Sequence, residues 1–189
     1  MVATIVLSAV LCTPCKAVAM QYVVEMLPAR IAGALPGFVA QLPDGESTFV
    51  YKDLVIGKDS ASEYWFGLAE RRKDKGEPLQ RRYLFSVLDD GRIGAIGGGT
   101  PTIVNERIVE GGVLRALLVA LTAYRQSGSK VPLATVGWRS TDKVVTVMFV
   151  PGRSDNEGAV IGGKTSRGVE THYDVDRGEL KVIRVTLAR

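Results

Sequence analysis

Three turn motifs constrain the fold of this chain more than any other feature, because each predicts a tight connection between two antiparallel strands. They are Pro43-Asp44-Gly45-Glu46, Asp89-Asp90-Gly91 and Asp176-Arg177-Gly178. A glycine at such a tip accepts the positive φ that short hairpin turns require. The sequence therefore predicts three β-hairpins, with paired strands at 38–42 and 47–53, at 83–88 and 92–96, and at 169–175 and 179–187.

The segments between these hairpins mix helical and strand patterns. Apolar spacings of three and four residues predict helices over 15–26 and 114–124, and capping and charge polarity predict a third over 60–75. Apolar, β-branched runs predict strands over 3–10, 133–138 and 143–150. We therefore expect an α+β fold with a mixed β-sheet and about three helices. A shift to nearly all-β sequence divides the chain into a mixed domain, 1–128, and a β-rich C-terminal extension, 129–189.

Composition and charge place the protein among ordinary globular chains. It has 189 residues, a formal net charge of +4 and two cysteines, too few for the disulfide framework of a small secreted protein. The apolar run at 2–11 has no Lys or Arg before it, so we favour a soluble cytoplasmic protein over a secreted one. No apolar run has the length of a membrane span.

The two cysteines form a Cys12-Thr13-Pro14-Cys15 motif between the strand at 3–10 and the helix at 15–26. A thiol at a helix N-terminus has a lowered pKa, and Lys16 adds positive charge beside it. Cys12 would attack a disulfide and Cys15 would resolve the mixed disulfide. The alternative is a pair of buried cysteines packed as small hydrophobic residues.

The segment IVLSAVLCTPCKAV resembles the active-site segment of the thioredoxin-like superfamily, in its glutaredoxin and disulfide-oxidoreductase branches. The segment Gly99-Thr100-Pro101-Thr102 is similar to the cis-proline motif of those proteins. The resemblance implies that Pro101 is cis and packs against the cysteines, that Thr100 contacts substrate backbone, and that 103–112 forms a hairpin before the helix at 114–124. It also implies that residues 43–97, which contain a predicted hairpin and helix, are an insertion into the thioredoxin-like core.

Three further patterns in the sequence each fit more than one interpretation. The basic residues between 71 and 82 lie near aromatic ones, which is typical of nucleic-acid contacts, but also of a solvated helix face; they are Arg71, Arg72, Lys73, Arg81 and Arg82. His172 shares a strand face with Glu170 and Asp174, a pattern that more often marks the wet face of an edge strand than a metal site. Residues 158–165 match the phosphate-loop expression, but a strand rather than a helix is expected after them.

Two functions from different classes follow. The first is a thiol–disulfide oxidoreductase that uses Cys12 and Cys15 without metal or organic cofactor, with protein thiols and disulfides as its partners. The second is a non-enzymatic structural or interaction protein of a homo- or hetero-oligomeric assembly, which contacts nucleic acid through the basic segment 71–82. The sequence does not decide between them.

Overall fold

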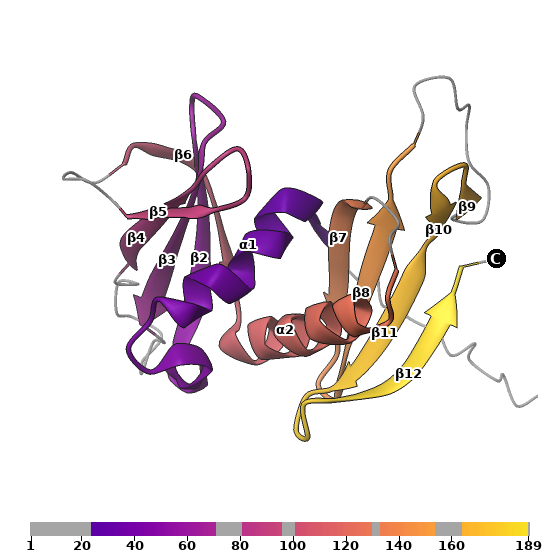
Figure 1. Ribbon diagram of the computed structural model, residues 1–189. Coiled ribbons are helices and arrows are strands. Elements are labelled where there is room, and N and C mark those ends of the chain that lie inside the picture. The colour runs from indigo at the N-terminus through magenta and orange to yellow at the C-terminus, as the bar shows by residue number, and fades with distance from the viewer. Residues whose placement is uncertain (1–23, 71–80, 96–100, 130–132, 154–163, 189) are drawn as a thin grey trace, which may run out of the picture.

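The computed structural model describes residues 24–70, 81–95, 101–129, 133–153 and 164–188, and these form an α+β fold that is mostly β (Figure 1). One five-stranded sheet, here called the β8 sheet, has the order β1-β7-β8-β11-β12. The other, called the β3 sheet, has the order β5-β4-β3-β2-β6. A two-stranded ribbon of β9 and β10 follows β8 in the chain.

The strands of the β8 sheet are β1 (Glu25–Pro28), β7 (Leu133–Ser140), β8 (Val144–Pro151), β11 (Thr171–Asp176) and β12 (Lys181–Leu187). Those of the β3 sheet are β2 (Lys52–Asp59), β3 (Tyr64–Glu70), β4 (Arg81–Val87), β5 (Ile93–Ala95) and β6 (Ile103–Val109). The ribbon is formed by β9 (Lys164–Thr165) and β10 (Gly168–Val169). The helices are α1 (Ala29–Ala40), the 3-10 helix η1 (Gly45–Val50) and α2 (Gly111–Gln126).

The order of elements repeats once along the chain. A strand, a helix and four sheet strands occur as β1, α1 and β2 to β5, and again as β6, α2 and β7, β8, β11, β12. The leading strand of each half pairs with the other half's sheet, because β1 pairs with β7 and β6 pairs with β2. Both helices start from the same backbone conformation, with φ and ψ of −53° and 138° at Pro28 and −54° and 136° at Glu110.

One continuous apolar core joins the two sheets through the helices. In Figure 1, α1 lies over the β3 sheet and α2 over the β8 sheet. Phe38 of α1 packs its ring 5.2 Å from that of Phe66 in β3. Tyr124 of α2 stacks on Phe149 of β8 at 4.2 Å. Such aromatic pairs add to the free energy gained by burying apolar area.

The structure confirms two of the three predicted hairpins and corrects the first. β4 with β5 and β11 with β12 are antiparallel pairs. Gly91 has the positive φ expected at its tip, whereas in the last turn the positive φ belongs to Leu180, at 51°, and not to Gly178. The hairpin expected across 38–53 is wrong, since Phe38 lies in α1 and Phe49 in η1. Both side chains are fully buried in the same core, with their ring centroids 6.3 Å apart.

Other expectations for the N-terminal part are also corrected. In place of the helix predicted over 60–75, the described residues form a turn at 60–63 and the strand β3. The hairpin predicted over 103–112 is the single strand β6 followed by α2. The helix at 15–26 lies mostly outside the described residues, but its last two residues belong to β1. Every pairing between described strands is antiparallel, so no mixed sheet is found among them.

Candidate interaction surface

Most of the residues predicted for a redox or nucleic-acid site lie outside the described part of the chain. They are Cys12, Cys15, Lys16, Thr100, Arg71, Arg72 and Lys73. Pro101 is described and half-buried, two residues before β6, but its position relative to the cysteines and the conformation of the Thr100–Pro101 bond are not. The predicted redox site therefore stays a prediction.

The described part of the basic segment does not form a surface of one charge. Arg81 belongs to β4, and the exposed Arg82 lines a cavity of about 810 Å³ near the start of that strand. The acidic residues Asp44 and Glu70 line the same cavity, and Glu70 pairs with Lys52 at 2.8 Å. Phosphate binding depends on unopposed positive charge, so the described residues supply little support for a nucleic-acid site here.

The His172 face of β11 holds internal polar contacts. The His172 ring Nε2 lies 2.6 Å from a Glu170 carboxylate oxygen. Asp174 instead accepts a hydrogen bond from the Thr146 hydroxyl at 2.7 Å. Within the described ranges, no group of three His, Cys, Asp or Glu side chains is arranged to hold a metal ion.

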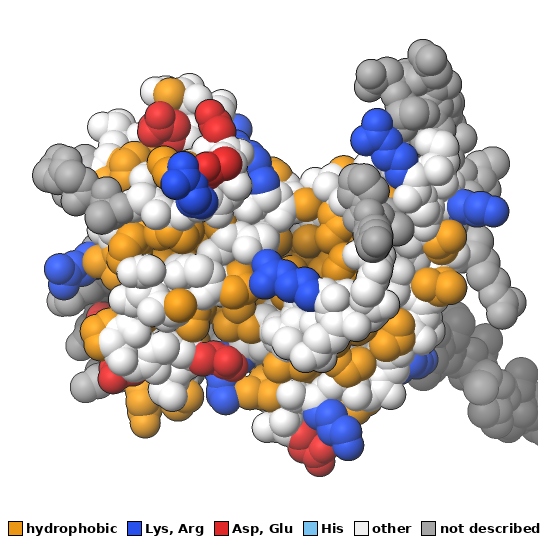
Figure 2. Space-filling model, viewed as in Figure 1, with side chains coloured by type: hydrophobic (Ala, Val, Ile, Leu, Met, Phe, Trp, Pro, Cys, Tyr) orange, Lys and Arg blue, Asp and Glu red, His pale blue; other side chains and the backbone are white. Residues whose placement is uncertain are grey.

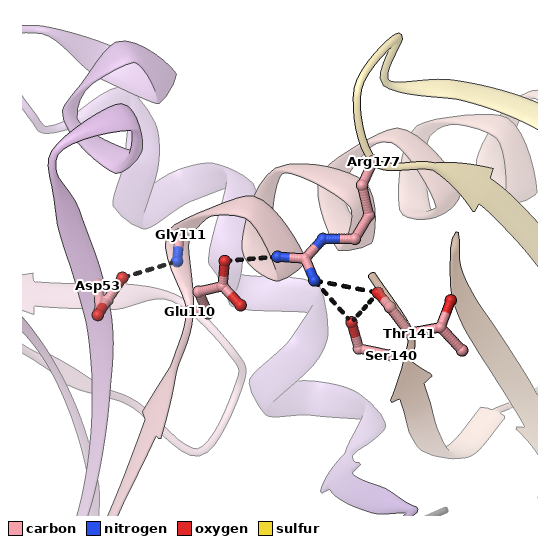
Figure 3. Close-up of polar contacts among 6 residues, drawn as sticks. All are labelled: Asp53, Glu110, Gly111, Ser140, Thr141 and Arg177. Carbon is pink, nitrogen blue, oxygen red and sulfur yellow. Dashed lines mark hydrogen bonds and ion pairs between the residues drawn. The ribbon is translucent and has the colours of Figure 1, made fainter. Parts of the chain in front are cut away.

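A polar joint at the start of α2 fixes the turn between β11 and β12 (Figure 3). The Arg177 guanidinium pairs with Glu110 just before α2 and donates to the Thr141 carbonyl at 3.1 Å in the β7–β8 turn. On the other side of Glu110, the backbone N–H of Gly111 donates to the Asp53 carboxylate of β2 at 2.9 Å. The joint links the two sheets and holds the base of β12.

β12 is the open end of the β8 sheet among the described strands. The Ala188 backbone N–H donates to the Glu170 carbonyl at 2.9 Å. Because amides alternate along an antiparallel strand, Thr186 also faces β11, and the backbone groups of Val185 and Leu187 face away from the sheet. Their side chains are 51% and 62% exposed.

The side chains of Val185 and Leu187 lie on the helix-covered face of the sheet. Val185 is paired with Tyr173 and Leu187 with Thr171, and directly opposed residues share a face. Tyr173 belongs to the core beside Tyr124. Figure 2 shows hydrophobic side chains at the right of this face, in the region of β12. Among the described residues, this edge therefore combines backbone groups that face away from the sheet with exposed apolar side chains.

The other sheet edges are less suited to the addition of a strand. β5 has three residues. β1 and β6 lie next to each other at the junction of the sheets, where the Arg107 guanidinium donates to the Met26 carbonyl at 2.6 Å and pairs with Glu25 at 3.7 Å. β12 has seven residues, as many as β6, and in Figure 1 it lies away from the junction of the sheets.

Sequence reasoning predicted the last hairpin but not the role of its outer strand. The signal was the apolar alternation of Val185 and Leu187, which also fits a strand inside a sheet. Only the strand order identifies β12 as an edge.

Comparison of the chain with protein-family models, with curated proteins and with solved structures finds no match. No helix in the described ranges is long and apolar enough to cross a membrane.

Proposed function

We propose that the protein is a non-enzymatic interaction module that binds an extended segment of another protein by adding it as a sixth strand to the β8 sheet, beside β12. The observation that carries the proposal is the outward direction of the Val185 and Leu187 backbone groups next to exposed apolar side chains. Open edges of this kind are templates for strand addition. Main-chain hydrogen bonds supply affinity, and alternate side chains supply specificity.

The pairing geometry determines which residues of the added strand face the core side. Val185 would form a hydrogen-bonded pair with the residue opposite it, and both side chains would lie on the helix-covered face. Apolar residues of the partner would therefore direct their own N–H groups at β12. A second copy of this chain fits less well, because β12 carries Lys181 and Arg184 and no acid, and pairing two such strands brings like charges together.

The test uses an eight-residue peptide in which valine alternates with glutamine, and follows amide hydrogen exchange of the protein by NMR. The Val185 and Leu187 amides should become at least about tenfold more protected at saturation, because they gain a hydrogen-bond partner. The Thr186 amide already faces β11 and should change little. Methylating the valine nitrogens of the peptide should abolish binding, whereas methylating the glutamine nitrogens should not.

A matched pair of variants completes the test. Val185→Lys combined with Leu187→Lys should abolish peptide binding, since charged edge residues block strand addition. Val104→Lys adds one lysine at a 56% exposed position of β6 and should bind normally. Absence of peptide binding, or binding that leaves Val185 and Leu187 unprotected, would overturn the proposal.

The disulfide-exchange hypothesis is kept as the second candidate because of the Cys12–Cys15 spacing. It predicts a Cys12 thiol with a pKa well below the ordinary value. The rate of alkylation of that thiol against pH measures it, with Cys12→Ser as the control.

A further inference from the structure

A hollow lies on the opposite face of the β8 sheet from the helices. Its volume is about 550 Å³, and strands β7, β8, β11 and β12 all contribute to it. The lining residues are Arg139, Thr141, Val144, Thr146, Asp174, Ile183 and Arg184. Tyr173 and Val175, the neighbours of Asp174 along β11, belong to the core, so the alternation of a strand directs Asp174 to this other face.

The floor of the hollow holds an ion pair. Asp174 is 5% exposed and accepts hydrogen bonds from Thr146 and, at 2.6 Å, from the Arg184 Nε. Arg184 itself keeps 68% of its side chain exposed. A carboxylate buried beneath a guanidinium fixes its position and leaves its outer side available, which is how rigid anion contacts are built.

The described lining of the hollow has more basic than acidic side chains. Among the described residues that line it, Arg139 and Arg184 carry guanidinium groups and Asp174 carries a carboxylate. Arg139 belongs to β7 and Arg184 to β12, so the cations stand on opposite sides of the short side chains of Thr146 and Asp174. A carboxylate entering from the β12 side meets Arg184 first.

A bulge brings the wall of this hollow to the open edge. The β11–β12 register shifts between Asp174 and Val175, and Ile183 lies between the paired residues Val182 and Arg184. Ile183 is exposed and lines the hollow together with Arg184. A strand added to β12 would place every second side chain on this face.

Resting on the proposed function, we propose that the added segment alternates apolar and acidic residues, and that the acidic side chain opposite Arg184 binds its guanidinium at the rim of the hollow. The apolar residues lie beside Val185 and Leu187 on the helix-covered face, and the acidic ones lie on the hollow face. One face of the edge thus selects for apolar side chains of the bound segment, and the other face selects for its acidic side chains.

The experiment compares three eight-residue peptides in which valine alternates with glutamate, glutamine or lysine, by titration calorimetry with the full chain. The glutamate peptide should bind about fivefold more tightly than the glutamine peptide, as expected for one exposed ion pair, and the lysine peptide more weakly than both. The glutamate preference should fall at 0.5 M salt, because salt screens exposed charges. In glutamine peptides with one glutamate, the gain should arise at a single position.

Two variants locate the effect. Arg184→Gln should remove the glutamate preference while glutamine-peptide binding persists, and Arg139→Gln should reduce it. Arg167→Gln, at an exposed position in the turn between β9 and β10, should keep it in full. The peptide comparison needs no variant, so it holds even if Arg184→Gln fails to fold.

The outcomes separate the two proposals. Equal affinity for glutamate and glutamine peptides, with Val185 and Leu187 protected in both, would overturn the acidic preference and leave strand addition standing. A glutamate preference that survives both Arg184→Gln and Arg139→Gln would also overturn it. Failure of all three peptides to bind would overturn the proposed function itself.

Discussion

Asp174 is the one charged residue among the buried polar side chains of the described part of the chain. Burial, the largest single effect, raises the pKa of its carboxyl group. Hydrogen bonds from Thr146 and Arg184, with the charges of Arg184 and Arg139, outweigh burial and leave the pKa below the ordinary value. The ionised form is therefore favoured by the fold, and its loss should cost stability.

Asp174→Asn should lower the free energy of unfolding at pH 7 by about 1–2 kcal/mol, a charged hydrogen bond discounted for the exposure of Arg184. A carboxylate with a lowered pKa stabilises the fold above its unfolded pKa of about 3.9. That contribution is lost as the pH falls through the lower folded value. Urea denaturation from pH 7 to pH 2 should thus show the two proteins converging below about pH 4; a difference that is constant with pH would contradict this.

Two turn glycines, Gly91 and Gly45, show what could be predicted from the sequence and what could not. The Gly91 tip has a φ of 80°, as the turn chemistry predicted, and its hairpin formed. The same chemistry failed at Gly45, whose φ is 52° but which opens a 3-10 helix. Local turn signals are equal in the two cases. The difference comes from the buried rings of Phe38 and Phe49, whose common core no local pattern reveals.

Among the elements, β12 depends on contacts made at its base rather than along its outer side. Asp176 accepts hydrogen bonds from the Gly178 and Glu179 backbone N–H groups and closes the turn. Arg177 ties that turn to the start of α2 and to the β7–β8 turn. The hairpin is thereby fixed to two neighbouring segments, which keeps the edge in one position.

Arg177→Ala should lower the free energy of unfolding by about 1–2 kcal/mol, because it removes one ion pair and a hydrogen bond to a backbone carbonyl. It should also speed amide exchange in the β11–β12 turn. Arg92→Ala is the control, since Arg92 is 78% exposed and pairs with Asp90 two residues away; it should have no measurable effect. Equal stability of the two variants would show that the Arg177 contacts do not stabilise the fold.

Element type was predicted best where burial and local pattern agree. The stripe of Leu114, Leu117 and Leu121 predicted α2, and all three side chains are buried. Residues 60–75 carried helical capping signals, but Trp65 and Phe66 favour a strand, and pairing with β2 and β4 decided the outcome. The candidate edge at β12 could not be predicted, because strand order is a tertiary property.

At the scale of the whole molecule, the two sheets share one core. The chain has two tryptophans, Trp65 in β3 and Trp138 in β7. Each sheet therefore carries its own fluorescent reporter. A shared core makes the sheets unfold as a single cooperative unit.

Trp65→Phe leaves the β8 sheet visible by fluorescence, and Trp138→Phe leaves the β3 sheet visible. In each variant, the urea midpoint from fluorescence should coincide with that from circular dichroism, because neither sheet keeps a complete core alone. Trp138 is buried, so its variant should unfold at lower urea overall. A fluorescence midpoint separated from the dichroism midpoint in either variant would show independent sheets.

The exchange of β1 and β6 between the two halves has a consequence for synthesis on the ribosome. β1 is among the first described segments to emerge, yet its partner β7 follows more than a hundred residues later. The β3 sheet is likewise incomplete until β6 has been made and can pair with the outer side of β2. Non-local pairing of this kind delays folding, so the nascent chain carries an unsatisfied strand until most of the protein has been made.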